Sequence, residues 1–364
     1  MDINSRNGRD AYALIRSLWP ALPERDFQRE QHSRFADHVA TVISDLYRLY
    51  ALPEDVTREV MSLIISRQPL TKSEVVGLLH GRYSGASTPP HGNEKLKALE
   101  AMARLWSMMQ VQVSGPQYAP RGDLFWAEGE TLLAAVKQHF DGRKAAAPPE
   151  PSENIDMEIS AAQLIHYNDL QILWTNNLAE HLAWNSRSRV LRVFEHKVWI
   201  WNHLCHPEHA AIPADVLDEL MCTLNLLFPL HDTPTRSLLE KYGMIESFYG
   251  LGYCGKDRSF EWSTYRYWRR EIQELNKLLS EPPRGLRQFW RPDRDRRNLL
   301  SLALFWLSGV MVLILTIIGS ICGIMSVQYS KEQTRLATLQ WDFSVALACA
   351  DPEIRSNFPE FCGK

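Results

Sequence analysis

The most regular feature of the chain is a long apolar run near its carboxyl end. From Leu299 to Val327 no residue carries a charge. The hydrocarbon core of a bilayer is about 30 Å thick, and roughly 20 apolar residues of helix cross it. The run is long enough to span this core with tilt. A buried helix of a soluble domain is the alternative, but such helices rarely run this far without a polar face. The pattern therefore predicts one transmembrane helix over 299–327.

Upstream of this run, apolar positions recur with the 3.6-residue period of amphipathic helices. In the segment 35–50 they return every three or four residues, and Pro53 follows its end. Thr71 and Glu74 have the spacing of a capping box, which predicts a helix that begins there. No alternation of period two is long enough to predict a sheet. The other predicted helices are 54–67, 96–109, 124–140, 159–184, 189–205, 214–228, 235–250 and 260–280.

A change of composition divides this helical region. The stretch GRKAAAPPEPSENIDME combines prolines, small residues and acidic residues, which is typical of a boundary between domains. The sequence thus predicts an all-α chain, with a helical bundle in two lobes and one C-terminal transmembrane helix. The expected parts are an N-terminal helical domain (1–145), a linker (146–158), a second helical domain (159–281), a basic juxtamembrane segment (282–298), the transmembrane helix (299–327) and an extracytoplasmic tail (328–364).

Arginines are concentrated just before the apolar run, at Arg284, Arg287, Arg291, Arg294, Arg296 and Arg297. Because basic residues near the ends of a span stay on the cytoplasmic side, we expect the large N-terminal part in the cytosol and the tail in a lumen or outside the cell. These arginines, together with Phe289 and Trp290, are also expected to contact the lipid headgroups of an anionic leaflet. The alternative is that they determine topology and bind no lipid.

Small residues follow one face of the predicted span. Gly309, Thr316 and Gly323 are seven residues apart, and Gly319 and Gly323 form a GxxxG pattern. Small side chains allow two helices in a membrane to approach closely. We therefore expect self-association through this helix, with a chance occurrence of GxxxG as the alternative.

The cysteines fit the predicted topology. Cys349 and Cys362 lie in the tail, where an oxidising environment and a short intervening loop favour a disulfide. The other four, Cys205, Cys222, Cys254 and Cys322, lack a CxxC spacing. We expect them to be reduced.

Composition and spacing limit the chemistry of the N-terminal part. A net charge of −3 gives no general attraction to nucleic acid, and the two short helices within 54–83 have too few basic side chains to be a DNA-binding helix-turn-helix. The histidines His196, His203, His206 and His209 lie close in sequence, with Glu195 and Glu208 among them. The spacing is not HExxH, and Pro207 interrupts the helix that would hold them. We expect no nucleic-acid partner, no metal and no other cofactor.

The sequence contains no nucleophile elbow, no phosphate-binding loop and no kinase signature. It is rich in tryptophan, with 12 residues. Aromatic anchors are frequent at interfaces, but we expect most of these side chains in the core.

Several short segments support a resemblance. They are Leu173-Trp174, Asn177-Leu178, His181-Leu182, Val193-Phe194-Glu195-His196-Lys197, Leu227-Phe228-Pro229, Thr235-Arg236, Tyr267-Trp268-Arg269, Gln288-Phe289-Trp290, Asp295-Arg296-Arg297-Asn298, Phe305-Trp306, Leu315-Thr316 with Gly319, Ala348-Cys349-Ala350-Asp351-Pro352 and Phe361-Cys362. With them, about half of the chain resembles an uncharacterised family of fungal single-pass membrane proteins. The resemblance implies this topology and an all-helical cytosolic region. It implies no catalytic or binding residue.

These observations favour a membrane-anchored adaptor or scaffold that acts by binding, in signalling or self-recognition. The alternative is a membrane-tethered enzyme, hydrolytic or metal-dependent, with a pocket in the second helical domain near Glu195 and His196.

Overall fold

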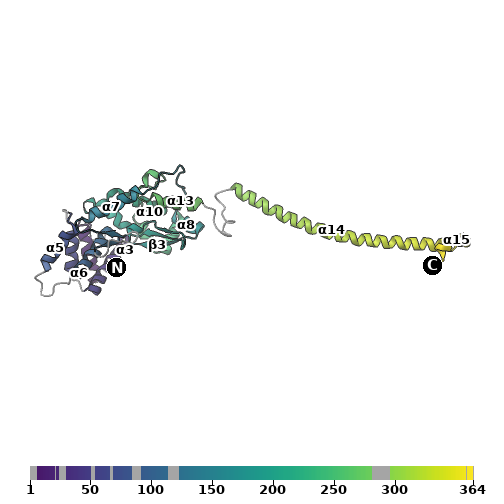
Figure 1. The fold of residues 1–364 in the computed structure, drawn as a ribbon, viewed down its shortest axis with the longest axis horizontal. Coiled ribbons are helices and arrows are strands. Elements are labelled where there is room, and N and C mark those ends of the chain that lie inside the picture. Colours follow the sequence, from purple (N-terminus) through teal and green to yellow (C-terminus); the bar gives the residue numbers. More distant parts are fainter. Residues whose placement is uncertain are drawn as a thin grey trace. The chain divides into compact units, whose positions relative to one another are not determined.

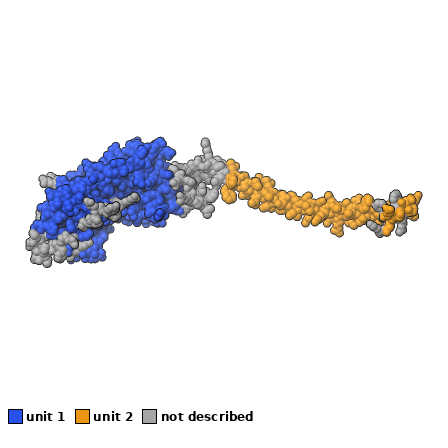
Figure 2. Space-filling view, viewed as in Figure 1, with its two compact units in different colours: residues 1–285 blue, residues 286–364 orange. Residues whose placement is uncertain are grey.

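The structure is a computed structural model that describes residues 6–20, 22–23, 30–50, 54–65, 69–83, 92–113, 123–280, 296–357 and 359–363. It is predominantly helical (Figure 1), as the sequence predicts. The chain divides into two compact units (Figure 2), unit 1 with residues 1–285 and unit 2 with residues 286–364.

The first part of unit 1 is built from helices. They are α1 (Arg6–Leu18), α3 (Glu30–Tyr50), α4 (Glu54–Ile64), α5 (Lys72–Tyr83), α6 (Gly92–Ser107) and α7 (Leu132–Ala145). The capping box before α5 is confirmed, because the Thr71 amide donates to Glu74 Oε2 over 2.8 Å and the Glu74 amide donates to Thr71 Oγ1 over 3.4 Å. The predicted helix over 124–140 is wrong in its first half. Leu124–Phe125 forms strand β2 beside the parallel strand β1 (Val111–Gln112), and the helix begins only after the N-cap Thr131.

The second part of unit 1 adds helices around a small sheet. The helices are α8 (Ala161–Asn168), α9 (Lys197–Cys205), α10 (Ala214–Leu227), α11 (Thr233–Lys241), α12 (Ile245–Phe248) and α13 (Arg269–Ser280), with the 3₁₀ turns η1 (Leu178–Glu180), η2 (Pro207–His209) and η3 (Trp262–Thr264). Strand β5 (Val190–Phe194) lies between β3 (Gln171–Thr175), to which it is parallel, and β4 (Trp184–Asn185), to which it is antiparallel.

This sheet corrects two predicted helices, 159–184 and 189–205. Helix α8 ends at Asn168, and its C-cap Asp169 has a left-handed backbone (φ 54°) and donates its amide to the carbonyl of Ile165. The chain then continues as β3. In the second case Leu191 and Val193 are buried while Arg192 is exposed, a period-two alternation too short to stand out in the sequence.

Helix α3 holds the two parts of unit 1 together. It packs against α1 and α6 from the first part and against α9 and α12 from the second. The ring centroids of Phe35 and His196 are 5.6 Å apart, and Arg34 donates to the carbonyl of Tyr242 over 2.8 Å. The chain therefore divides after residue 285, and not at the boundary expected between the two helical domains, 146–158. The buried apolar residues of both parts form one hydrophobic cluster.

The segment 146–158, expected to be a linker, lies against the second part of unit 1. Trp262 Nε1 donates to the carbonyl of Glu153 over 2.6 Å, and the Asp156 amide donates to Asn276 Oδ1 over 2.8 Å. Arg269 contacts Pro148 and Glu150. The prolines prevent regular structure here, yet side chains of the second part bind the exposed carbonyls.

Tryptophans contribute strongly to the core of unit 1. Trp19, Trp126, Trp199 and Trp268 are among the largest fully buried side chains. The described tryptophans of unit 1 are buried or half-buried, which confirms the prediction that they belong mostly to the core. An exposed aromatic patch does not form from the described tryptophans of this unit.

Unit 2 is dominated by one helix, α14 (Arg296–Ala348), which is continuous over 53 residues and is therefore about 80 Å long at ~1.5 Å per residue. Its segment Leu304–Ala348 contains a window apolar enough to cross a membrane, and none of that window is buried. It is the single helix of this kind among the described residues. Two short helices, α15 (Pro352–Asn357) and α16 (Pro359–Cys362), follow.

Candidate functional site

The described part of unit 1 contains a cavity of about 310 Å³ between α3 and α6, which we call the α3–α6 cavity. Helix α3 contributes one wall and α6 another, and residues of the turn between β3 and η1 complete the lining. The lining residues are His38, Val42, Asp45, Leu46, Lys97, Glu100, Ala101, Arg104, Leu105, Met108, Met109, Gln110, Asn176 and Asn177. Polar and apolar groups thus share one cavity, which is typical of small-ligand sites.

The α6 wall carries a cluster of three charges. Lys97, Glu100 and Arg104 are three or four positions apart and therefore share one face of the helix. Lys97 Nζ donates to Glu100 Oε2 over 3.1 Å, and Arg104 Nη2 donates to Glu100 Oε1. The carboxylate is nearly buried, with 10% of the Glu100 side chain exposed, whereas Lys97 is 43% and Arg104 36% exposed. Two cations against one carboxylate leave a surplus positive charge on this wall.

Asp45 also lines the cavity, from the α3 wall. Its carboxylate accepts a hydrogen bond from Arg48 over 3.0 Å, and both side chains are well exposed. This pair is balanced in charge and screened by solvent. It does not cancel the positive surplus of the α6 wall.

Hydrogen bonds fix the end of the cavity. Asn177 Oδ1 accepts from the amides of Gln110 (3.3 Å) and Ala179 (3.2 Å), and so caps η1 and holds the chain after α6 at the same time. The carbonyl of Met108 accepts from the Leu178 amide over 2.6 Å. Met108 itself has a left-handed backbone, with φ of 48°. A non-glycine residue in this region is strained, and such strain is frequent at functional sites.

His38 is a polar residue that lines the cavity from α3. Asn176 Nδ2 lies 3.3 Å from His38 Nδ1. An amide nitrogen can only donate, so Nδ1 accepts and the proton resides on Nε2. Burial lowers the pKa of His38 below its ordinary value of 6.5. The side chain is therefore a neutral hydrogen-bond donor at neutral pH.

Behind His38 lies the pair that the sequence offers as an enzyme site, Glu195 and His196. The His38 and His196 rings are 5.1 Å apart, but His196 is 2% exposed and neither member of the pair lines the cavity. Burial raises the pKa of Glu195, although Arg34 at 3.5 Å opposes this. Burial also lowers the pKa of His196 well below 6.5, with smaller effects from His38 and Arg34.

The remaining histidines of the sequence cluster do not converge on one point. His203 is 1% exposed and packs edge-on against the rings of Trp19 and Trp199. His206 and His209 are partly exposed and both lie near Glu208. No group of three His, Cys, Asp or Glu side chains in the described ranges is placed to hold a metal ion.

Two other buried charges of unit 1 have structural partners. Lys197 Nζ donates to Asn225 Oδ1 (3.0 Å) and to the carbonyl of Gly252 (2.6 Å), and burial lowers its pKa to about 8. The Glu219 carboxylate accepts from the consecutive amides of Arg266, Tyr267 and Trp268. Burial raises its pKa to about 7, and these amides oppose the shift. Both side chains connect α9 or α10 to later segments of unit 1.

The membrane-associated predictions fall on unit 2 and on the residues before it. Arg284, Arg287, Phe289, Trp290, Arg291 and Arg294 lie outside the described residues, and Arg296 and Arg297 are the first residues of α14. Gly309, Gly319 and Gly323 face open space, since a Cβ atom built on each would meet nothing within 4 Å. Thr316 Oγ1 donates to the carbonyl of Val312 over 2.6 Å within the helix. Self-association through these four positions stays a prediction.

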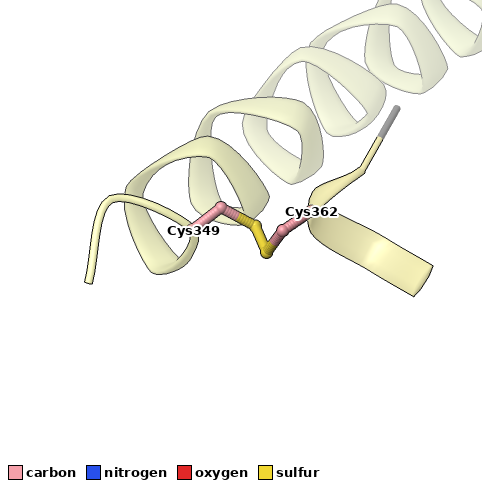
Figure 3. Close-up of a disulfide and its surroundings, with 2 residues drawn as sticks. All are labelled: Cys349 and Cys362. Carbon is pink, nitrogen blue, oxygen red and sulfur yellow. A yellow bond between two sulfur atoms is a disulfide. The ribbon is translucent and has the colours of Figure 1, made fainter. Parts of the chain in front are cut away.

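The predicted disulfide between Cys349 and Cys362 is present (Figure 3). Their Cα atoms are 5.5 Å apart, within the range that a disulfide requires. Cys349 follows the last residue of α14 and Cys362 is the last residue of α16, so the bond fastens the end of the tail to the end of the long helix.

The sequence analysis missed the α3–α6 cavity. The spacing of Lys97, Glu100 and Arg104 is visible in the sequence, but it is equally typical of a solvated helix face. No local signal connects these residues to His38 or to Asn176. No family model, curated protein or solved structure matches the chain, so the resemblance to fungal single-pass membrane proteins stays an expectation.

Proposed function

We propose that the protein is a membrane-anchored, non-enzymatic adaptor or scaffold. In this proposal α14 crosses the membrane once, unit 1 lies in the cytosol and binds partners, and the disulfide-closed tail lies in a lumen or outside the cell. The observation that carries the proposal is the pairing of one exposed apolar helix with a packed unit that has a ligand-sized cavity.

The orientation is supported by two independent features. Basic residues precede the apolar run, and such residues stay on the cytoplasmic side. The disulfide lies beyond the opposite end of that run, and disulfides persist in oxidising compartments.

The chemistry of the cavity supports binding over catalysis. Its described lining contains no serine, threonine or cysteine, the hydroxyl and thiol nucleophiles that a neighbouring base activates. Most of its polar groups are held in fixed hydrogen bonds. Such a wall can recognise a ligand without transforming it.

A second candidate function, a membrane-tethered enzyme, rests on one observation. Glu195 has a raised pKa and the adjacent His196 a lowered pKa, and opposite shifts in neighbouring groups are typical of acid–base sites. Against it, His196 is buried behind His38. A Glu195→Gln variant that retains its cellular neighbours would favour the adaptor.

Proximity labelling in cells tests the proposal. The full chain carries the labelling enzyme at its N-terminus, and a matched control carries it on residues 286–364 alone. We expect cytosolic proteins that are enriched with the full chain and absent from the control. Labelling of lumenal proteins, or the same neighbours with both chains, would contradict the proposal.

A further inference from the structure

The α6 wall of the α3–α6 cavity carries one more positive charge than the carboxylate of Glu100 balances. Glu100 is shared by Lys97 and Arg104, so one carboxylate faces two cations. Arg104 also donates from Nε to the carbonyl of Val111 over 3.1 Å. Its Nη1 group has no hydrogen-bond partner among the described residues. Lys97, whose side chain is 43% exposed, has donors in excess of its single bond to Glu100.

Apart from Asp45, which is paired with Arg48, the remaining surfaces of the cavity are apolar or neutral. Val42 and Leu46 face it from α3, and Ala101, Leu105 and Met108 from α6 and the turn after it. His38 is neutral and offers its Nε2 proton. A volume of about 310 Å³ lies at the lower end of the range for small-ligand sites. The cavity thus fits a small apolar group that bears one anionic oxygen pair.

We propose that the α3–α6 cavity binds a carboxylate joined to an apolar group of side-chain size. Lys97 and the free donors of Arg104 bind the carboxylate, His38 donates to it or to a neighbouring polar atom, and the apolar residues cover the rest. A planar guanidinium matches a carboxylate better than a point charge does. This inference rests on the proposed binding role of unit 1 and specifies its ligand.

Two sources present this chemistry: a free small acid, and the carboxyl terminus of a polypeptide with an apolar last residue. The partners of an adaptor are polypeptides, but a small acid has the same group. The experiment therefore includes a probe of each kind. The first is 3-phenylpropionate, and the second is N-acetyl-Gly-Gly-Phe with a free carboxyl group.

Binding is measured by calorimetry on the full chain in detergent micelles, and each acid is compared with its neutral amide. We expect at least one acid to bind about fivefold more tightly than its amide, the size expected for a partly exposed charge pair. The peptide binding alone would identify a polypeptide terminus, and 3-phenylpropionate binding alone a small acid. Equal binding of acid and amide, or no saturable binding of either acid, would overturn the inference.

Variants assign the binding to the cavity. Ala101→Phe fills the space and should abolish saturable binding, while an unchanged urea midpoint shows that the chain is folded. Lys97→Gln should weaken acid binding about three- to fivefold and leave amide binding unchanged. Lys256→Gln is the matched control, because Lys256 is 40% exposed and pairs with one carboxylate, Asp218, over 3.0 Å. Unchanged acid binding in Lys97→Gln would also overturn the inference.

The outcomes separate this inference from the proposed function. Cytosolic neighbours that persist in Ala101→Phe, together with no binding of either acid, would remove the carboxylate site and leave the adaptor role. Specific acid binding by a full chain that labels the same neighbours as residues 286–364 alone would keep the carboxylate site and remove the adaptor role.

Discussion

Unit 1 and helix α14 differ in how far their apolar side chains are buried. In unit 1 the largest side chains face inward, and Trp199 and Trp268 are fully buried. Buried charges there have partners, as Glu219 has in three consecutive amides. Along α14 the apolar side chains are exposed, and Leu313 is 62% exposed.

The comparison shows which surroundings each region requires. Unit 1 removes apolar surface from water by its own packing, which is the main favourable contribution to folding. Helix α14 satisfies its backbone internally, as a helix must within lipid, but its apolar side chains are exposed. A polar substitution should therefore matter most in α14 for membrane insertion, and an apolar truncation should matter most in unit 1 for folding.

The largest effect is expected from acidic residues in the middle of the span. Leu313→Asp combined with Ile317→Asp should disfavour insertion by about 6 kcal/mol, since each aspartate at a helix centre costs ~3 kcal/mol. The measurement is the fraction that resists extraction by alkaline carbonate, which should fall to near zero. Leu173→Asp is the control, because Leu173 is 49% exposed in unit 1. Full retention of the double variant would show that α14 is not the anchor.

A matched pair of truncations compares the two regions directly. Leu220→Ala removes a side chain of α10 that is 0% exposed and should lower the free energy of unfolding of unit 1 by about 2–5 kcal/mol. Leu315→Ala, at a position 60% exposed in α14, should change it by less than about 0.5 kcal/mol. Urea unfolding of both full-length variants, followed by tryptophan fluorescence, measures the difference. Equal losses would mean that α14 packs on unit 1.

Buried histidines should make unit 1 sensitive to acid. Burial lowers the pKa of His181 and of His203 from 6.5 to about 3. The folded state therefore stays neutral at these sites while the unfolded state binds protons below about pH 6.5. Their contribution is fully present above that pH and is lost as the pH falls toward 3. Between pH 7 and 5 each costs roughly 2 kcal/mol.

Urea midpoints at the two pH values measure this loss. His203→Phe, which retains an aromatic ring between Trp19 and Trp199, should reduce the loss by about 2 kcal/mol. Helix α14 contains no histidine, so carbonate-resistant insertion should not depend on pH in this range. A variant with the same acid sensitivity as the wild type would show that His203 is not the cause.

The smallest effect on unit 1 is expected from the disulfide. Cys362→Ser opens the link to Cys349 and loosens the end of the tail, but should change the unfolding of unit 1 by less than about 0.5 kcal/mol. In sealed vesicles with the cytosolic face outward, the remaining Cys349 should be shielded from a membrane-impermeant maleimide added outside. Modification of Cys349 under these conditions would contradict the proposed orientation.

The sequence predicts unit 2 better than it predicts unit 1. A charge-free run needs only local information, and the disulfide needs only two cysteines close in sequence. In unit 1, helices such as α3 and α10 are visible in the period of their apolar residues, whereas β3 and β5 are not. Their pairing joins Gln171 with Val190 and Thr175 with Phe194, contacts that no short window contains.

The candidate site is less predictable for the same reason. Lys97, His38 and Asn176 come from α6, α3 and the turn after β3, and only the packing of α3 brings them to one cavity. The histidine cluster was the more visible signal, but His203 belongs to the aromatic core, and His206 and His209 lie at its edge. These histidines are close in sequence, but they do not form one site.

Protease protection in sealed microsomes, oriented with their cytosolic face outward, tests the central claim most directly. The chain carries one epitope before residue 1 and another after residue 364, and a chain without 299–327 is the control. We predict that the full chain resists carbonate extraction, that external protease removes the N-terminal epitope, and that the C-terminal epitope survives until detergent is added. A protected N-terminal epitope, or release of the full chain by carbonate, would contradict the account.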